Sequence, residues 1–299
     1  MNAYLDCIIC QQRQALRILR LAANDQNIQE QVFRQVMERL VKVEWTTDPM
    51  TISKGTYDLI TRVTGKPDPY QALKRQSNEE VLRLYPQLQE YVQHSADPLL
   101  TACKLAVAGN IMDFGAKEHF NIQETIQQVL TTDFAINHYD RLRDELRHAS
   151  SVLLFADNAG EIVFDKLLLE TMLQSHALPR ITVVVKKLPI LNDTMLEDAR
   201  QIGLLELPNI TIRYVNTAVN GNAPWLNPEV SGWIQAHDVV IAKGQANYEV
   251  LSAVPGIYFL LIAKCAIVAA DTGTTTGALI LKYSSSDPAG IAARGEGTL

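Results

Sequence analysis

The sequence predicts an α/β protein in which an all-helical domain precedes a Rossmann-like domain of three α/β/α layers with a mainly parallel sheet. Two observations carry this prediction. Residues 1–148 show apolar side chains at helical spacing almost throughout. From there on, short β-branched apolar runs alternate with helical patterns about every 25 to 30 residues, as in successive strand–helix units. We therefore expect two domains, residues 1–148 and 149–299.

The elements of both halves follow from local patterns. In the helical half, one helix is expected to end before Gly65–Pro69, another to span Tyr70 to about His94, and a third to begin at Pro98. The second half contains five apolar runs of strand length. These runs are Val152–Phe155, Ile181–Val185, Ile210–Tyr214, Val239–Ile241 and Tyr258–Ile262.

Composition narrows the class of protein. The chain has 299 residues, 47% of them hydrophobic, and a net charge of -6, which argues against a general nucleic-acid binder. The four cysteines do not suggest a disulfide framework. The amino-terminal residues lack the pattern of a signal peptide, and the most apolar run, Ile257–Ala270, is too short to span a bilayer. We expect a cytoplasmic protein that binds neither nucleic acid nor membrane; the oligomeric state stays open, a homo-oligomer included.

The polar group Asp157–Glu161 directly follows the first expected strand and precedes a helix. In open α/β sheets, ligands bind at such turns, at the carboxyl ends of the strands. Asp157 and Asn158 offer adjacent oxygen atoms, which Mg²⁺ and Mn²⁺ prefer as ligands. The alternative is that these two side chains only cap the next helix.

Asp193 follows the second expected strand and precedes a short helix. Neighbouring parallel strands would bring its turn close to Asp157 and Asn158, so that two carboxylates and an amide could hold a divalent cation, with water completing the shell. The alternative is that Asp193 caps the helix at Thr194.

Two further strand ends carry groups suited to a phosphate. Gly244 opens a helix after the strand Val239–Ile241, and its backbone N–H groups could face an anion. Lys264 follows the strand Tyr258–Ile262 and would supply a positive charge, unless it is an ordinary surface lysine. Metal-binding oxygens and a lysine at one edge of the sheet favour phosphoryl chemistry.

Two motifs in the helical half are less specific. Cys7 and Cys10 have the spacing of zinc ligands, but a structural zinc site needs about four ligands and no second pair exists. Two thiols on one helix are the simpler interpretation. Asn110 and Asp113, three residues apart, would share one face of a helix end, where local side-chain bonds are the simpler interpretation.

The ordered combination of motifs resembles the damage-control phosphatases, ARMT-like metal-dependent enzymes formerly catalogued as a domain of unknown function. The resemblance covers nearly the whole chain and is greatest to the compact prokaryotic-type branch with an N-terminal Cys-x-x-Cys. The motifs that carry it are Cys7–Cys10, Asp68–Lys74, Ala108–Gly115, Asp157–Glu161, Ile190–Asp193, Lys243–Glu249 and Lys264–Cys265.

The resemblance implies a role for each matching position. Asp157, Asn158 and Asp193 match metal ligands, and Lys264 matches a phosphate-contacting lysine. Glu161 matches a catalytic motif position that orients ligands or acts on a water. The residues implied to line the substrate pocket are Asn110, Asp113 and Asn247, beside the Gly244 turn. The implied substrates are small phosphorylated metabolites, either sugar phosphates or damaged phosphometabolites, and the implied metals are Mn²⁺, Co²⁺, Ni²⁺ or Mg²⁺.

The leading hypothesis is therefore a divalent-metal-dependent phosphatase in which a metal-bound water or the Asp157 carboxylate attacks phosphorus. One alternative is an S-adenosylmethionine-dependent carboxyl methyltransferase, although no glycine-rich cofactor loop follows the first strand. Another is a non-catalytic module that binds a nucleotide or a metal. Binding of that cofactor, or tight nucleotide binding without turnover of any phosphate ester, would favour these alternatives.

Overall fold

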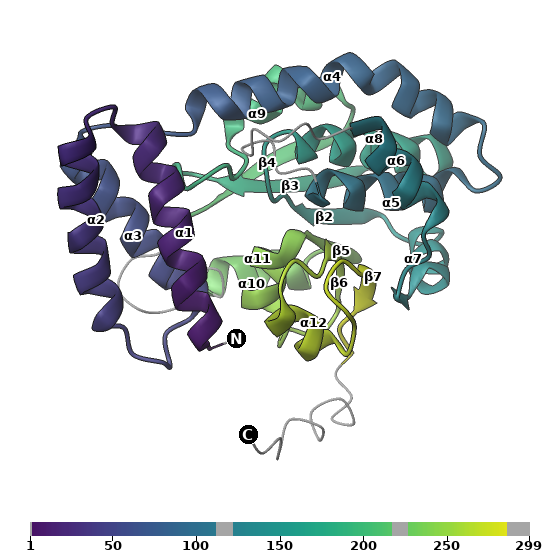
Figure 1. The fold of residues 1–299 in the computed structure, drawn as a ribbon. Helices are drawn as coiled ribbons and strands as arrows, with labels where there is room; N and C mark the ends of the chain where they lie inside the picture. The colour runs from purple at the N-terminus through teal and green to yellow at the C-terminus, as the bar shows by residue number, and fades with distance from the viewer. Residues whose placement is uncertain (1, 112–121, 217–226, 286–299) are drawn as a thin grey trace.

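The fold is described by a computed structural model, covering residues 2–111, 122–216 and 227–285 (Figure 1). Before the main sheet come the helices α1 (Leu5–Ala22), α2 (Gln26–Val41), α3 (Pro49–Thr64), α4 (Gln71–Gln93), α5 (Pro98–Ile111), α6 (Ile122–Thr131) and α7 (Tyr139–Leu146). The later helices are α8 (Glu161–Ser175), α9 (Leu196–Gln201), α10 (Pro228–Gln235), α11 (Gly244–Leu251) and α12 (Ala266–Thr272). The strands are β1 (Ile136–Asn137), β2 (Ser151–Phe155), β3 (Arg180–Lys186), β4 (Ile210–Val215), β5 (Val239–Lys243), β6 (Ile257–Ile262) and β7 (Leu279–Tyr283).

These strands form one seven-stranded sheet in the order β1-β7-β6-β5-β2-β3-β4. All neighbouring pairs are parallel except β6 and β7. The chain moves outward from β2 through β3 to β4, and then returns to pair β5 with the other side of β2. The strand order therefore reverses between β2 and β5, and ligands bind at the carboxyl end of such a switch point.

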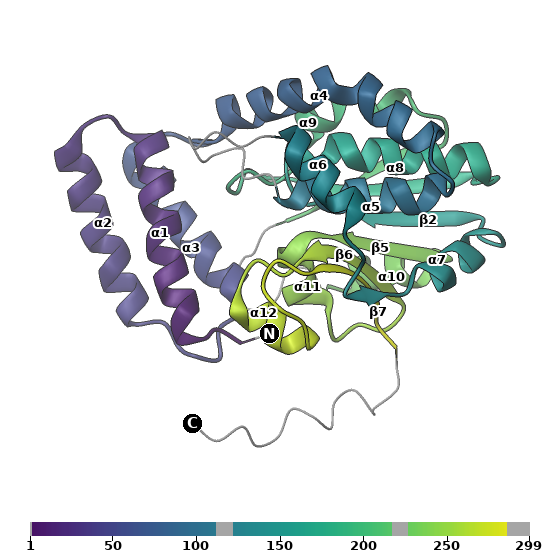
Figure 2. The same ribbon diagram turned by 45° about the vertical axis from the view of Figure 1, so that its right-hand side comes forward.

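Both faces of the sheet are covered by helices, as expected of a three-layer fold (Figures 1 and 2). Alternate residues of β2 point to opposite faces. Val152 and Leu154 belong to a core shared with α4 to α9, whereas Leu153 and Phe155 belong to a core shared with α10, α11 and α12. This double burial explains why the strands read as continuous apolar runs.

Helices α1, α2 and α3 pack into a bundle with a hydrophobic core of its own, beside one end of the sheet (Figure 2). Ile190, from the segment after β3, is fully buried in this core and links the bundle to the sheet. Helices α4 to α7 instead share the core of the sheet. The boundary near residue 148 stays a prediction, and the division of the cores lies earlier, between α3 and α4.

The expected α/β fold is confirmed, and each of the five expected strands is present as β2 to β6. The expectation of an almost wholly helical first half missed β1, a two-residue strand that pairs with β7. So short a strand carries no alternation that a sequence pattern could show. Among the described residues, no helix is both long enough and apolar enough to cross a membrane.

Candidate active site

The Asp157 turn lies between β2 and α8. Gly160 precedes the helix with φ 79°, a left-handed conformation that lets the chain turn sharply. No side chain caps α8 at Gly160; the backbone N–H of Gly160 donates instead to Asn78 Oδ1 of α4, at 2.6 Å. Asp157 and Asn158 are therefore not helix caps, and the capping alternative is wrong.

The Asp193 segment lies directly against this turn, as the sequence predicted. Asn158 and Asp193 form an isolated antiparallel bridge, and the backbone N–H of Thr194 donates to the Asp157 carbonyl at 2.8 Å. Leu191 has a φ of 49°, which is unfavourable for any residue other than glycine. Such strained backbone conformations cluster at functional sites. Helix α9 begins only at Leu196, so Asp193 is not its cap either.

Gly244 joins the site from the other side of the switch point. It begins α11 with φ 77°, and a Cβ atom at this position would collide with the Asp157 carboxylate. Asn247, one turn later, is fully buried, and its Nδ2 donates to the carbonyls of Lys243 at 2.7 Å and Ala156 at 3.2 Å. The ends of β2 and β5 are thereby held together around the Asp157 side chain.

Negative charge accumulates at this point. Burial, together with the nearby Glu161 and Asp193 carboxylates, raises the pKa of Asp157 to about 8, although Lys264 and Lys186 oppose the shift. Burial also raises the pKa of Asp193, against the influence of Lys186, whose Nζ lies 3.4 Å from Asp193 Oδ2. A divalent cation would stabilise the ionised form of both carboxylates.

Three buried oxygens in this region test whether a cation fits. Thr194 Oγ1 and Asn247 Oδ1 have no hydrogen-bond partner among the described residues, and the third, Asp193 Oδ2, is paired with Lys186 Nζ at 3.4 Å. Asn158 Nδ2 donates to Asp157 Oδ2 at 2.8 Å. The described residues contain no group of three or more His, Cys, Asp or Glu arranged around a metal. Asp157, Asp193 and the Asn158 amide supply oxygen atoms, the type of ligand that Mg²⁺ and Mn²⁺ take.

A second polar cluster, centred on Lys243, lies beside the first; one of its oxygens, Asp165 Oδ2, has no hydrogen-bond partner among the described residues. Lys243 Nζ donates to Asp165 Oδ1 at 2.7 Å, to the Ala106 carbonyl at 2.8 Å and to Glu161 Oε1 at 2.9 Å, and all three charged side chains are fully buried. Burial disfavours the charged lysine, but the Asp165 and Glu161 carboxylates outweigh it and raise the pKa of Lys243. The network fixes Glu161 Oε1, and Glu161 Oε2 lies 3.4 Å from Asn158 Nδ2.

Residues of α4 reach the site although no site role was predicted for them. Lys74 is buried, pairs with Asp68 at 2.8 Å, and its charge lowers the pKa of Asp193. Asn78 holds Gly160 and also donates to Asp198 at 3.0 Å. The Asp68–Lys74 motif was the available signal, but only the folded chain shows that it contacts the sheet edge.

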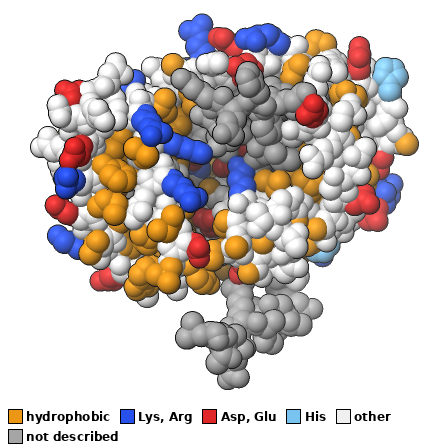
Figure 3. All heavy atoms as spheres, viewed as in Figure 1, with side chains coloured by type: hydrophobic (Ala, Val, Ile, Leu, Met, Phe, Trp, Pro, Cys, Tyr) orange, Lys and Arg blue, Asp and Glu red, His pale blue; other side chains and the backbone are white. Residues whose placement is uncertain are grey.

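The remaining predicted residues lie as follows. Lys264 is exposed, its charge acts on Asp157, and its backbone N–H donates to Gln245 Oε1 at 3.0 Å. Asn110 lies in α5 next to Gly109, where a Cβ atom would be 3.1 Å from the Glu161 Cα, but its side chain is not among those described. Asp113 lies outside the described residues. Figure 3 shows Lys and Arg side chains around the hollow between the α1–α3 bundle and the sheet.

Comparisons with known proteins identify the family of this chain. A model of the damage-control phosphatase ARMT1-like domain matches residues 3–280. This chain belongs to that family. The family expected from the motifs is thereby confirmed over nearly the whole sequence.

Relatives of this ARMT1-like chain include a damage-control phosphatase of Archaeoglobus fulgidus, 29% identical over 88% of this chain and 92% of the relative. A damage-control phosphatase of Pyrococcus horikoshii is 28% identical over 94% of this chain and 97% of the relative. The crystal structure of a family protein from Pyrococcus horikoshii matches with a TM-score of 0.84 and 27% identity, covering 95% of this chain and all of the other.

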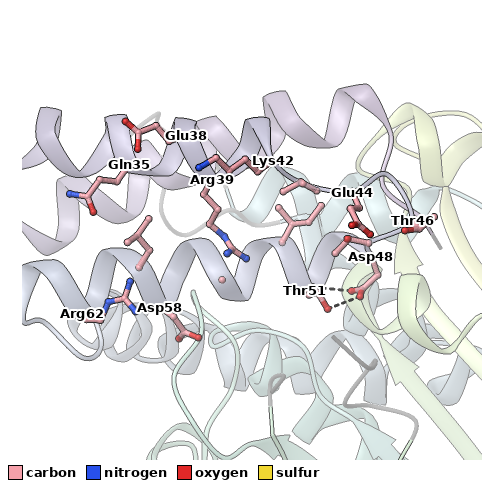
Figure 4. Close-up of a pocket in the computed structure, with 15 residues that line it drawn as sticks. Gln35, Glu38, Arg39, Lys42, Glu44, Thr46, Asp48, Thr51, Asp58 and Arg62 are labelled. Carbon is pink, nitrogen blue, oxygen red and sulfur yellow. Dashed lines mark hydrogen bonds between the residues drawn. The ribbon is translucent and has the colours of Figure 1, made fainter. Parts of the chain in front are cut away.

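A groove of about 1030 Å³ lies elsewhere, between α2 and α3 (Figure 4). Arg39 crosses it and lies against Gly55, where a Cβ atom would collide with the guanidinium. Basic and acidic side chains alternate along the groove, so it does not select an anion. Its charged residues are Glu38, Arg39, Lys42, Glu44, Asp48, Asp58 and Arg62, and none of them is a predicted site residue.

Proposed function

We propose that the protein is a divalent-metal-dependent phosphatase that hydrolyses phosphate monoesters of small metabolites, either sugar phosphates or damaged phosphometabolites. The observation that carries this proposal is the convergence of Asp157, Asn158 and Asp193 at the switch point of the sheet. The names of the relatives, damage-control phosphatases, support the same chemistry.

Asp157, Asn158 and Asp193 would hold the ion, which we expect to be Mn²⁺, Co²⁺, Ni²⁺ or Mg²⁺. When bound, a divalent cation neutralises charge on the phosphate and makes a bound water more acidic. Glu161 and Lys243 keep this donor set in place, because Glu161 contacts Asn158 and is itself held by Lys243. The buried pair of Lys186 and Asp193 fixes the third donor.

The phosphate would lie between the ion and Lys264. This lysine is exposed, follows β6, and acts electrostatically on Asp157, so its ammonium can reach an anion bound beside the carboxylate. The amino end of α11 at Gly244 presents backbone N–H groups from the same edge. Water or the Asp157 carboxylate would then attack phosphorus while the bond to the ester oxygen breaks and the alcohol leaves with a proton; on the second route, water would afterwards release phosphate from Asp157. Both routes use the same arrangement of residues.

The test is hydrolysis of an aryl phosphate by chelated protein, followed by addition of Mn²⁺ or Co²⁺. We expect activity to be lost on chelation, restored by the metal and absent from Asp193→Ala at the same metal concentration. Activity that survives both chelation and Asp193→Ala would refute the metal role. A screen of phosphorylated metabolites with the metal-loaded protein would then identify the substrate class.

The same preparation tests the two alternatives. Calorimetry with S-adenosylmethionine should show no binding if the protein is a phosphatase. Tight nucleotide binding without turnover of any phosphate ester would instead favour a regulatory module.

A further inference from the structure

Three of the four cysteines come together where the α1–α3 bundle meets the sheet. The start of α1, which carries Cys7 and Cys10, lies beside α11 and α12 in both ribbon views (Figures 1 and 2). Cys265 immediately precedes α12. Burial raises the pKa of the Cys10 thiol, and the neighbouring negative groups Cys7, Cys265 and Glu249 raise it further. Residues far apart in the sequence therefore lie within electrostatic reach of one another.

Two of these groups are held by one glutamine. Gln245 Nε2 donates to Glu249 Oε1 at 2.8 Å and to Cys265 Sγ at 3.5 Å. Gln245 Oε1 accepts from the backbone N–H of Lys264 at 3.0 Å. Burial raises the pKa of the Cys7 thiol as well, and Glu249 and Cys265 again add to the shift. Gln245 of α11 thus links the Glu249 carboxylate of the same helix to the Cys265 thiol that precedes α12.

We propose that Cys7, Cys10 and Cys265, with Glu249 as the fourth ligand, bind a structural Zn²⁺. Three thiolates and a carboxylate match the ligand types and the number that tetrahedral zinc takes. The described residues form no closed cluster of metal ligands, so zinc binding requires these side chains to turn toward one another. Rotation about the Cys χ1 bonds moves each sulfur without moving the backbone, and Cys10 is exposed enough to turn.

This zinc would have a structural role, cross-linking two segments of the chain, and would not take part in the phosphatase reaction. It would join α1 of the bundle to the segment that follows β6, and that segment also carries Lys264. Cys103, the fourth cysteine, is buried in α5 within the core of the sheet and takes no part. The proposal is independent of the proposed function, because none of its four ligands belongs to the Asp157 cluster.

The experiment uses the full-length protein, reduced and freed of metal by chelation, with Co²⁺ as a spectroscopic probe. Thiolate ligands give Co²⁺ an intense charge-transfer absorption that oxygen ligands do not give. We expect this absorption to saturate at one Co²⁺ per chain, to disappear on addition of Zn²⁺ and to be abolished in Cys265→Ser. It should persist in Cys103→Ala and in Asp193→Asn, which removes a ligand of the other site only.

A second measurement guards against misfolding of the cysteine variants. With Asp193→Asn present in every variant to remove the other site, Zn²⁺ should raise the melting temperature of the protein and of its Cys103→Ala variant, but not that of a Cys265→Ser or Glu249→Gln variant with normal circular dichroism. The proposal is overturned if the wild type shows no thiolate absorption, or if the absorption is unchanged in Cys265→Ser. A disulfide joining Cys265 to Cys7 or Cys10 in freshly isolated protein would overturn it as well.

Discussion

Two buried polar clusters lie side by side at the carboxyl edge of the sheet, and they differ in how their carboxylates are paired. Lys243 makes hydrogen bonds to Glu161, Asp165 and a backbone carbonyl, all between 2.7 and 2.9 Å. In the neighbouring cluster, burial and the Glu161 and Asp193 carboxylates raise the pKa of Asp157 to about 8, and Asp193 Oδ2 has Lys186 Nζ at 3.4 Å. A buried lysine bonded to both carboxylates stabilises a structure, whereas carboxylates that raise each other's pKa favour the binding of a cation. The first cluster is thus the support and the second is the binding site.

The largest effect is expected from a change in the binding cluster. Asp193→Asn should lower kcat/KM for an aryl phosphate on the order of 10³-fold, because it removes a charge that holds the cation. The melting temperature should change little, because burial disfavours the ionised Asp193 and raises its pKa, whereas the buried Lys186 loses its partner. Asn192→Ala, in the same segment, is the matched control and should change neither quantity much. A stability loss without an activity loss would reverse the roles of the two clusters.

In the supporting cluster, Lys243→Met should lower the free energy of unfolding by about 3–5 kcal/mol, because two buried carboxylates lose their common partner. Chemical denaturation measures this change. Combining it with Glu161→Gln and Asp165→Asn should recover part of the loss, since the uncompensated charges are gone. If Lys243→Met alone were neutral for stability, the network would not be the support described here.

Gly244 lies where the binding cluster contacts α11. It can be compared with Gly256, where an added Cβ atom would contact no other atom. Gly244→Ala and Gly256→Ala both place a side chain at positive φ, which costs about 1–2 kcal/mol. Only at Gly244 does the new Cβ atom collide with Asp157, whereas nothing lies within 4 Å at Gly256. We expect both variants to lose stability and only Gly244→Ala to lose most phosphatase activity. Equal activity in the two variants would show that Asp157 need not be held at this position.

The smallest effect is a pH dependence of the supporting cluster. Burial raises the pKa of Asp165 from 3.8 to about 7, although Lys243 opposes the shift. Between these values the folded protein keeps a proton that the unfolded chain has lost, so this group makes the unfolding free energy fall as pH rises. The difference in unfolding free energy between wild type and Asp165→Asn should change across this window and be constant below it. A difference that does not vary with pH would contradict the assignment.

The sequence was sufficient to predict the strands, and the turns at their carboxyl ends, because both depend on local patterns of apolar and polar residues. The apolar runs of β2 and β3 end abruptly in Asp157 and in the segment before Asp193, and parallel pairing then places both turns at one edge. The helix-capping alternative could not be excluded in this way, because a turn Asp looks the same whether or not it caps. The φ of Gly160 and the start of α9 at Leu196 decided that question.

The residues that hold the binding cluster in place could not be predicted from sequence patterns. Lys186 and Lys243 each end a strand, so their positions were visible, but their burial against carboxylates depends on helices packed over them. Lys74 and Asn78 come from α4, more distant still in the sequence. The two-residue β1 and its partner β7 are set by edge pairing and not by any periodicity. Long-range contacts of this kind decide which polar residues a site uses.

The central claim is that Asp157, Asn158 and Asp193 share one cation. Crystals soaked with Mn²⁺ and measured at a wavelength where manganese scatters anomalously test it most directly. The account predicts one anomalous peak bounded by oxygen atoms of these three side chains, and its absence in Asp193→Asn crystals. A peak elsewhere, or none in a protein whose phosphatase activity depends on Mn²⁺, would contradict it.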